Sequence, residues 1–466
     1  MFAPSLRQLA FVPSLRRLLP AVAIAFALSA RLLPQAPPPA TSFPPGVAQV
    51  AIPAVGGVNA ALLHAIAPVV ERAIARGAFP GAVVLAAHHG RVIYRGVFGN
   101  RSIVPSVQPM RFDTMFDLAS LTKVIATTPA IMQLLEEGKI RLDEPVAHYW
   151  PEFAENGKGK VTIRELLTHT SGLPPDIPSP ELLLLLHLPP TGFPGWPPDK
   201  NVAAPWHGEA AALKLVEQVA LINPPGKKFV YSDINFIVLG YLVERLGGEP
   251  LNVYAARHIY TPLGMTSTMF LPPAALKNRI APTQIINGVL RWGVVHDPTA
   301  KAMGGVSGLA GLFSDAHDLG RYAQCLLNGG VLRVSDGHGH RRAARILGPL
   351  AVLKMTTPQT PLGLTDIRGL GWDLDSAYSR NRGVLFPIGS FGHTGWTGTS
   401  IWIDPVTQTY LIILTSRVHP EAAPGAGVMA VREEVANIVA ASLDDVNLRG
   451  LSNTGRGERA RAYPVN

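Results

Sequence analysis

The chain has 466 residues, of which 47% are hydrophobic and 16% charged, and its formal net charge is +9. This length and composition fit an enzyme-sized folded chain with one large domain or two modest ones. The Lys and Arg residues form no stripe with interleaved aromatic residues, so the positive charge does not predict a nucleic-acid partner. The single cysteine, Cys325, excludes an intrachain disulfide and a multi-cysteine metal site, and its surroundings predict a buried helical position.

The N-terminal segment has the pattern of an export signal. Arg16 and Arg17 precede the apolar run 18–30, which ends in small residues. The run is short for a membrane-spanning helix, although Arg31 directly after it also fits an uncleaved anchor. We therefore expect residues 1–33 to be a signal peptide or an N-terminal membrane anchor and the protein to be periplasmic or extracellular. A buried N-terminal helix is the alternative.

The segment after the apolar run is rich in proline. Residues 34–57 predict an extended linker, because proline removes backbone donors and favours extended conformations. We expect one folded domain over 58–446, with a proline-rich insertion at 174–206 and a flexible polar tail at 447–466. The insertion fits either a mobile lid over a site or an irregular packed loop.

Apolar residues recur at helical or strand spacing throughout this domain. Two hairpins are predicted, one over 81–99 with a His-His-Gly turn and one over 398–416 near the end of the chain. Helices are predicted at 58–77, 122–137, 162–169, 209–220, 235–247, 316–328 and 427–443. Strands at both ends with helices between them predict an α+β fold, in which the terminal strands meet in one antiparallel sheet with helices packed on it.

A serine and a lysine three residues apart are the first candidates for chemistry. Ser120 and Lys123 lie in "FDLASLTKVIATT", where the helix predicted over 122–137 begins. Residues three apart share one helix face, so an unprotonated lysine there can act as base for the serine. Burial among apolar neighbours would lower the pKa of the lysine. The spacing alone is weak evidence, because a first-turn serine and a solvated lysine also explain it.

Two further stretches strengthen the catalytic interpretation. "YSDIN", residues 231–235, offers a phenol, a carboxylate and an amide at the start of a helix, and "GHTGWTGTS", residues 392–400, leads into a strand. With these three motifs in this order, the chain resembles the serine β-lactamase and penicillin-binding-protein superfamily, in its class C-like branch of DD-peptidases and β-lactamase-like esterases. The resemblance runs from about Gly81 to Ser416 and includes the phrases "LLTHTSGLP", "GGVSGLAGLFS" and "TSRVHP".

The resemblance implies a β-lactamase-like fold, with an antiparallel sheet flanked by helices plus an all-helical subdomain. It also implies a serine hydrolase that forms an acyl-serine and needs no metal or other cofactor. Ser120 would be the nucleophile, with Lys123 and Tyr231 as its proton-transfer partners. The backbone N–H groups of Ser120 and Trp396 would form the oxyanion hole. The remaining matching positions would contact substrate: Asp233, His393, Thr394 and Gly395.

Two residues depart from the pattern of that branch. Asp233 stands where an asparagine is usual, and its carboxylate would favour a charged Lys123, although helix capping also explains an aspartate there. His393 stands where a lysine is usual, and a neutral imidazole is a poorer partner for the carboxylate of a β-lactam or a D-Ala terminus. Arg417 either supplies the missing positive charge or faces solvent.

These features predict a carboxylesterase or a D-Ala-D-Ala carboxypeptidase-like enzyme acting on a small-molecule or peptide substrate, which a cell wall can supply. A class C-like β-lactamase and a non-catalytic module that binds peptidoglycan or penicillin stay open as alternatives. The chain contains no G-x-S-x-G motif, which argues against an α/β-hydrolase. The glycine-rich stretch 304–314 lacks the Lys-Ser/Thr of a phosphate-binding loop and predicts close backbone contact near the pocket.

Overall fold

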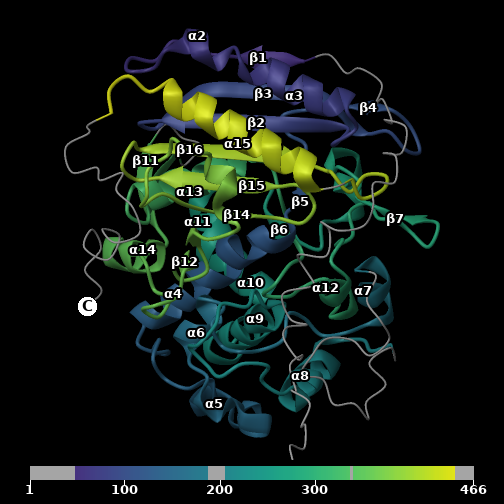
Figure 1. Ribbon diagram of the computed structural model, residues 1–466, viewed down its shortest axis with the longest axis vertical. Helices are drawn as coiled ribbons and strands as arrows, with labels where there is room; N and C mark the ends of the chain where they lie inside the picture. The colour runs from purple at the N-terminus through teal and green to yellow at the C-terminus, as the bar shows by residue number, and fades with distance from the viewer. Residues whose placement is uncertain (1–47, 187–204, 336–339, 424, 447–466) are drawn as a thin grey trace, which may run out of the picture. The chain divides into compact units, whose positions relative to one another are not determined.

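An antiparallel sheet of nine strands carries the fold (Figure 1). The computed structural model describes residues 48–186, 205–335, 340–423 and 425–446, so the predicted signal or anchor, the tail and most of the predicted insertion lie outside the described residues. The strands run in the order β1 (Gln49–Ala51), β3 (Arg91–Ser102), β2 (Gly81–His88), β16 (Thr409–Thr415), β15 (Ser400–Asp404), β14 (Phe391–Thr394), β13 (Asp373–Asp375) and β12 (Ile367–Arg368), and β4 (Gln108–Pro109) pairs with β3.

Both faces of the central strands are buried, because side chains alternate between two hydrophobic layers. In β2, Val84 packs into one layer, while Val83 and Leu85 pack into the other. The first layer is formed by helices from the two ends of the described chain, α2 (Ala60–Leu63), α3 (Ile66–Ala75) and α15 (Gly425–Ala441), which lie together on the sheet in Figure 1. On the opposite face, α13 (Ala316–Leu327) packs against β2 and β16.

A helical region follows the first hairpin and is organised around the buried helix α9 (Asp233–Gly247). Its neighbours are α4 (Thr128–Glu136), α6 (Ile163–Leu167), α8 (Glu209–Gln218) and α10 (Leu251–Ala255). The other helices are α5 (Val146–Tyr149), α7 (Pro180–Leu185), α11 (Thr261–Leu263), α12 (Pro298–Ala302) and α14 (Pro349–Thr356). None of the helices in the described ranges combines the length and apolar character needed to cross a membrane.

Three small sheets complete the architecture. The first has the order β5 (Phe116–Asp117), β9 (Leu312–Ser314), β6 (Met269–Phe270) and ends three residues before Ser120. The other two are hairpins, β7 (Ile285–Ile286) with β8 (Val289–Leu290) and β10 (Val331–Ser335) with β11 (Arg341–Arg345). The short sheet β5–β9–β6 therefore fixes the chain that leads into the serine motif.

The predicted α+β class is confirmed, and the two terminal hairpins do meet in one sheet. β2 pairs with β16 over its length, from Ala82 opposite Thr415 to His88 opposite Thr409. The predicted linker differs from the structure at its end, because Gln49–Ala51 pairs with β3. All three residues of this edge strand are exposed, so they leave no hydrophobic pattern to detect. The fold begins earlier than residue 58.

The single cysteine occupies the position expected from its surroundings. Cys325 lies in α13 and is completely buried. Burial raises the pKa of its thiol to about 12. The side chain is therefore a small hydrophobic core group that stays protonated near neutral pH.

Candidate active site

Ser120 lies on a strained turn directly after β5. Its predecessor Ala119 has φ +45°, a conformation that is uncommon for a residue with a β-carbon. The Asp117 carboxylate accepts a hydrogen bond from the Ala119 N–H at 2.8 Å and stabilises this turn. Ser120 then falls in the 3-10 turn Ala119–Leu121. Backbone strain of this kind is typical of functional sites.

The helix predicted over 122–137 is not regular at its start. Lys123–Thr127 forms a π-helical segment, in which the Thr128 N–H donates to the Lys123 carbonyl, and the α-helix α4 begins only at Thr128. Pro129, which has no N–H group, follows directly and favours this irregular entry. The Val124 carbonyl, left out of the α-helical pattern, accepts a hydrogen bond from the Tyr322 hydroxyl at 2.7 Å.

Lys123 lies beside Ser120 as the three-residue spacing suggested, and its side chain is fully buried. Its Nζ is 3.1 Å from Ser120 Oγ and 2.9 Å from the Leu309 carbonyl oxygen. A third acceptor, Asp233 Oδ1, lies 2.6 Å away. Three acceptors match the three protons of an ammonium group.

The ionisation of Lys123 differs from the expectation based on burial. Burial lowers the pKa of the lysine, but the carboxylate of Asp233 and the nearby Tyr231 outweigh it, so the pKa lies above its usual value. Lys123 is therefore a charged group in this state. Asp233 forms an ion pair with it and makes no capping hydrogen bond, so the capping explanation for this aspartate is wrong.

Tyr231, the third predicted catalytic residue, lies in the same cluster as Ser120 and Lys123. The Lys123 Nζ lies 5.4 Å from the centre of its ring. Burial raises the pKa of the Tyr231 hydroxyl, while the Lys123 charge and a hydrogen bond with Ser120 act in the opposite direction. The structure thus brings Ser120, Lys123 and Tyr231 together in one site.

His169 is a member of this cluster that the sequence did not single out. Its ring stacks on Tyr231 with 4.3 Å between ring centres. Its Nδ1 accepts hydrogen bonds from the Ser232 N–H at 3.1 Å and from the Asn235 side-chain amide at 3.2 Å. Burial lowers its pKa well below the usual value, so the imidazole is neutral. Its place within "LLTHTSGLP" was the only sequence signal for this role.

The turn between β14 and β15 packs directly against the residues that precede Ser120. The Thr397 hydroxyl donates to the Asp117 carbonyl at 2.7 Å, and the Thr399 hydroxyl donates to the Leu118 carbonyl at 3.1 Å. Gly395 permits this approach, because a β-carbon there would lie 2.3 Å from the Leu118 oxygen. The turn thereby holds the backbone of Trp396 at the loop that carries the serine.

The Trp396 side chain is half exposed at this turn. The Arg417 guanidinium lies 4.6 Å above its ring. Arg417 is buried and donates to the Ala423 carbonyl at 2.7 Å, so the alternative of a solvent-facing arginine is wrong. Its contact with Trp396 positions the indole instead.

His393 is neutral and buried, and it lies on the strand that ends at Thr394. Its Nδ1 donates to the Thr394 carbonyl at 2.9 Å, which leaves Nε2 as an acceptor. Within the part of the chain that the structure describes, Nε2 has no hydrogen-bond partner. Burial lowers its pKa well below the usual value, and the charges of Arg368 and Lys123 add to the effect.

Two aspartates close to the ion pair, the buried Asp176 and the partly buried Asp297, could not be identified from sequence patterns. Desolvation and the nearby Asp233 carboxylate together raise the pKa of Asp297 to about 7. Burial also raises the pKa of Asp176 well above its usual value. Both oxygens of Asp176 lie 3.1 Å from the Thr299 hydroxyl. A set of coupled carboxyl groups therefore adjoins Lys123.

The glycine-rich stretch provides the close backbone contact that was predicted. A β-carbon on Gly308 would lie 2.0 Å from the Phe236 carbonyl oxygen, so this loop approaches α9 more closely than a side chain allows. The contact places the neighbouring Leu309 carbonyl against Lys123.

Comparison with known proteins identifies the family of this chain. Residues 66–435 match the family described as β-lactamase. A relative from Salmonella agona (strain SL483), named "Putative D-alanyl-D-alanine carboxypeptidase", is 35% identical over 340 residues, which cover 67% of this chain and 71% of the relative. A relative of the same name from Escherichia coli (strain K12) is 32% identical over 380 residues, covering 74% of this chain and 80% of the relative.

Solved structures share the fold. EstCE1, described as a hydrolase with promiscuous acyltransferase activity, superposes with a TM-score of 0.61 at 24% identity and covers 81% of this chain and 99% of its own. A family VIII carboxylesterase superposes with a TM-score of 0.58 at 20% identity and covers 84% of this chain and 99% of its own. At such identities the likeness concerns the fold alone.

Proposed function

We propose a substrate class for this chain, which belongs to the β-lactamase family and is a serine hydrolase of the β-lactamase and penicillin-binding-protein type. In this proposal, Ser120 attacks esters or amides that carry no negative charge near the cleaved bond. The observation that supports this choice is the neutral, buried His393, whose Nε2 can accept a hydrogen bond but offers no positive charge. In the β-lactamases of the class C-like branch that the chain resembles, lysine is usual at this position.

Acylation requires Lys123 first to give up a proton, because the ammonium group cannot accept one. Asp233 Oδ1, 2.6 Å from Nζ, is the nearest acceptor for it. The neutral amine then takes the proton of Ser120 as the Oγ–carbon bond forms and the carbonyl electron pair moves to oxygen. The N–H groups of Ser120 and Trp396 stabilise that oxyanion.

Collapse of the tetrahedral intermediate breaks the bond to the leaving group. Tyr231, hydrogen-bonded within the same network, relays a proton to the departing oxygen or nitrogen. Water then attacks the acyl-serine by the same route and restores the Ser120 hydroxyl. Thr394, Gly395 and Asp233 line the position of the substrate in this scheme, and the reaction uses no metal or other cofactor.

A D-alanyl-D-alanine carboxypeptidase activity is the second candidate. The names of the relatives at 35% and 32% identity favour it. Such a substrate carries a terminal carboxylate. The neutral His393 offers no positive charge to pair with it. A β-lactamase activity faces the same obstacle, and a non-catalytic binding module would not require the intact Ser120, Lys123 and Tyr231 cluster.

The proposal is tested by labelling and by substrate comparison. The protein is incubated with a fluorophosphonate and with a fluorescent penicillin, and the modified peptide is mapped. Turnover of short-chain aryl esters, D-Ala-D-Ala peptides and a chromogenic cephalosporin is then compared. We expect modification of Ser120, fastest turnover of the esters and loss of all turnover in Ser120→Ala. Unchanged turnover in that variant would refute the mechanism, and faster peptide or cephalosporin hydrolysis would refute the substrate class.

We further propose that the protein acts after export, in the periplasm or outside the cell, with or without retention by an N-terminal anchor. The support is the arginine-then-apolar order within residues 1–33. Its partner would then be a small-molecule or peptide substrate of the cell envelope, with no nucleic acid involved. Fractionation of the native host, with mass determination of the mature N-terminus, tests this location.

A further inference from the structure

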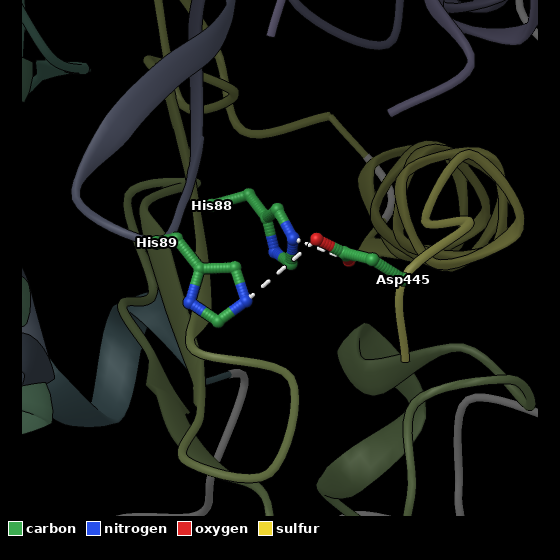
Figure 2. Close-up of side chains that lie close together, drawn as sticks. All are labelled: His88, His89 and Asp445. Carbon is green, nitrogen blue, oxygen red and sulfur yellow. Dashed lines mark hydrogen bonds and ion pairs between the residues drawn. The ribbon is translucent and has the colours of Figure 1, made fainter. Parts of the chain in front are cut away.

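We propose that His88, His89 and Asp445 form a structural binding site for a divalent transition-metal ion, with Zn²⁺ as the best match, at the end of the sheet opposite the catalytic turn. Figure 2 shows both imidazole rings facing the same carboxylate. The His88 Nε2 lies 2.9 Å from Asp445 Oδ1, and the His89 Nε2 lies 3.9 Å from Asp445 Oδ2. The three ligand atoms lie within 4.8 Å of one another.

These spacings suit tetrahedral coordination. Zinc binds imidazole nitrogen and carboxylate oxygen at about 2.0–2.2 Å, so two of its ligand atoms lie roughly 3.3–3.6 Å apart. The observed separations of 2.9 Å and 3.9 Å bracket that value. Two imidazoles and one carboxylate are donors that zinc accepts, and a water molecule would complete the set.

The hydrogen bonds around His88 fix the orientation of its ring, with Nε2 toward the carboxylate of Asp445. Its Nδ1 lies 2.9 Å from the Thr409 hydroxyl, and that hydroxyl donates its proton to the Thr407 carbonyl at 3.0 Å. Thr409 can therefore accept from an Nδ1–H, and in that tautomer Nε2 presents its lone pair to an ion beside Asp445 Oδ1. A bound ion would replace the hydrogen bond that joins Nε2 to this oxygen. A metal-ligating histidine is typically held in this way by its other ring nitrogen.

Accessibility also fits an ion site. The His88 side chain is buried, while those of His89 and Asp445 are 55% and 41% exposed, so an ion can enter and keep water as a ligand. Within the described part of the chain, only the two histidines form ion pairs or hydrogen bonds with the Asp445 side chain.

A second group of possible ligands does not share these features. Asp315 and Asp318 lie near His317, but the Asp315 carboxylate already accepts the Asp318 N–H at 2.9 Å and pairs with Arg279 at 3.3 Å. Asp318 accepts the Ser267 N–H at 2.7 Å. These carboxylate oxygens already have hydrogen-bond or ion-pair partners, so we assign no ion to them.

The position of the site indicates a stabilising role. His88 ends β2, His89 turns the hairpin with φ +46°, and Asp445 follows α15. An ion there would tie the first hairpin to the end of the last helix. His88 is the strand partner of Thr409 at one end of the central strands. The turn that holds Trp396 lies at the opposite end, between the paired residues Thr394 and Ser400. The site is therefore separate from the reaction and does not rest on the proposed function.

The test uses the full chain without a polyhistidine tag, stripped with a chelator and dialysed. Co²⁺ is added as a spectroscopic substitute, and Zn²⁺ binding is measured by calorimetry and by thermal melting. We expect one ion per chain, visible absorption bands of tetrahedral Co²⁺ that Zn²⁺ removes, and a melting temperature that rises with Zn²⁺. His89→Ala and Asp445→Asn should each weaken binding at least about tenfold and leave ester hydrolysis unchanged.

His148→Ala is the matched control, because His148 is an exposed histidine 3.7 Å from a carboxylate, that of Glu144, without a second histidine. It should leave the Co²⁺ spectrum and the Zn²⁺ affinity unaltered. Absence of stoichiometric binding, or binding that survives both His89→Ala and Asp445→Asn, would overturn the proposal. In the first case a proton, and no metal ion, would bridge His88 and Asp445.

Discussion

At the catalytic centre, the charge of Lys123 depends on its neighbours more than on its burial. Its Nζ is surrounded by Ser120, Leu309 and Asp233, all as acceptors. An ammonium group in this arrangement is stable but cannot act as a base. In the proposed mechanism, Asp233 therefore sets the pH at which Ser120 becomes reactive.

Replacing Asp233 with asparagine should shift the pH profile of the enzyme. The carboxylate raises the pKa of Lys123, while burial alone would lower it. In Asp233→Asn the pKa falls, so the neutral amine forms at lower pH. We expect the acidic limb of kcat/KM to move down by about one to three pH units. The limb is measured with an aryl ester, and Asp233→Glu, which keeps the charge, serves as control. If the acidic limb of kcat/KM stays at the same pH in Asp233→Asn, ionisation of Lys123 does not determine that limb.

Introducing a positive charge at residue 393 should change the substrate preference. His393→Lys would place an ammonium group where the neutral imidazole now lies. We expect kcat/KM for a D-Ala-D-Ala peptide to rise relative to an aryl ester by about tenfold, the equivalent of one charge-assisted hydrogen bond of roughly 1.4 kcal/mol. His393→Gln, which stays neutral, should show no such gain. If His393→Lys and His393→Gln give the same ratio of kcat/KM for the peptide to kcat/KM for the ester, residue 393 does not select substrates by their charge.

The nearness of Ser120 and Lys123 was predictable from the sequence, whereas their ionisation was not. The three-residue spacing and the two companion motifs indicated Tyr231 and His393 as neighbours. The charge on Lys123 depends on Asp233, which is 110 positions away. The raised pKa values of Asp176 and Asp297 depend on contacts with each other or with Asp233, among three segments far apart in the sequence. Sequence patterns report spacing along the chain and contain no information on such distances.

Among the elements of the fold, the turn between β14 and β15 packs closely against the chain that leads to Ser120. It is joined to the chain before Ser120 by the hydroxyl groups of Thr397 and Thr399. Gly395 makes this contact sterically possible. The proposed oxyanion hole thus depends on two segments that can approach this closely only because residue 395 has no side chain.

A methyl group at Gly395 should therefore remove activity. In Gly395→Ala the β-carbon would lie 2.3 Å from the Leu118 oxygen and 2.2 Å from Thr399 Oγ1, which forces the turn away from the serine. We expect kcat/KM to fall by roughly a hundredfold or more, because one oxyanion donor is displaced. Gly425→Ala, where a β-carbon meets nothing within 4 Å, is the control. Near-normal kinetics of the folded Gly395→Ala protein would exclude Trp396 from the oxyanion hole.

The irregular geometry around Ser120 and Lys123 could not be predicted from the sequence. Apolar periodicity correctly located helical structure near 122–137, but it cannot distinguish a π-helical entry from a regular one. Pro129 was the visible sign of a departure, since it cannot donate to the preceding turn. The strained Ala119 left no such sign, because alanine is common in regular helices as well.

For the molecule as a whole, buried carboxyl groups make stability depend on pH. The pKa of Asp297 is about 7 in the folded chain, well above the 3.8 of an unperturbed aspartate. Because the folded state binds the proton more tightly, the contribution to the free energy of unfolding is present at low pH and declines as the pH rises toward 7. Burial of one carboxyl group thus disfavours the fold under mildly alkaline conditions.

Asp297→Asn should remove this dependence. Asparagine still caps α12, whose first turn the Asp297 carboxylate now holds through the Ala300 N–H at 2.8 Å. We expect the variant and the parent to melt alike near pH 4 and the variant to be more stable near pH 8, by up to roughly 4 kcal/mol at about 1.4 kcal/mol per pKa unit. Denaturant unfolding at both pH values measures the difference. A difference that does not grow with pH would refute the assignment.

The overall architecture was more predictable than its edges. Alternating apolar residues in the two terminal hairpins indicated one shared sheet, and β2 and β16 do pair along their length. The edge strand Gln49–Ala51 escaped detection because all three of its side chains face solvent. Hydrophobic patterning identifies elements that bury a face, and an edge strand held by backbone hydrogen bonds need not bury one.

The burial of the only cysteine has a practical consequence for studying this protein. Cys325 is completely enclosed, and burial raises the pKa of its thiol to about 12, so maleimide reagents find no thiolate to attack in the folded chain. A cysteine introduced at an exposed position would be the single reactive thiol without removal of the native one. Dyes for fluorescence or spin labels can therefore be attached at one chosen place, and the onset of labelling at Cys325 would itself report unfolding of the core.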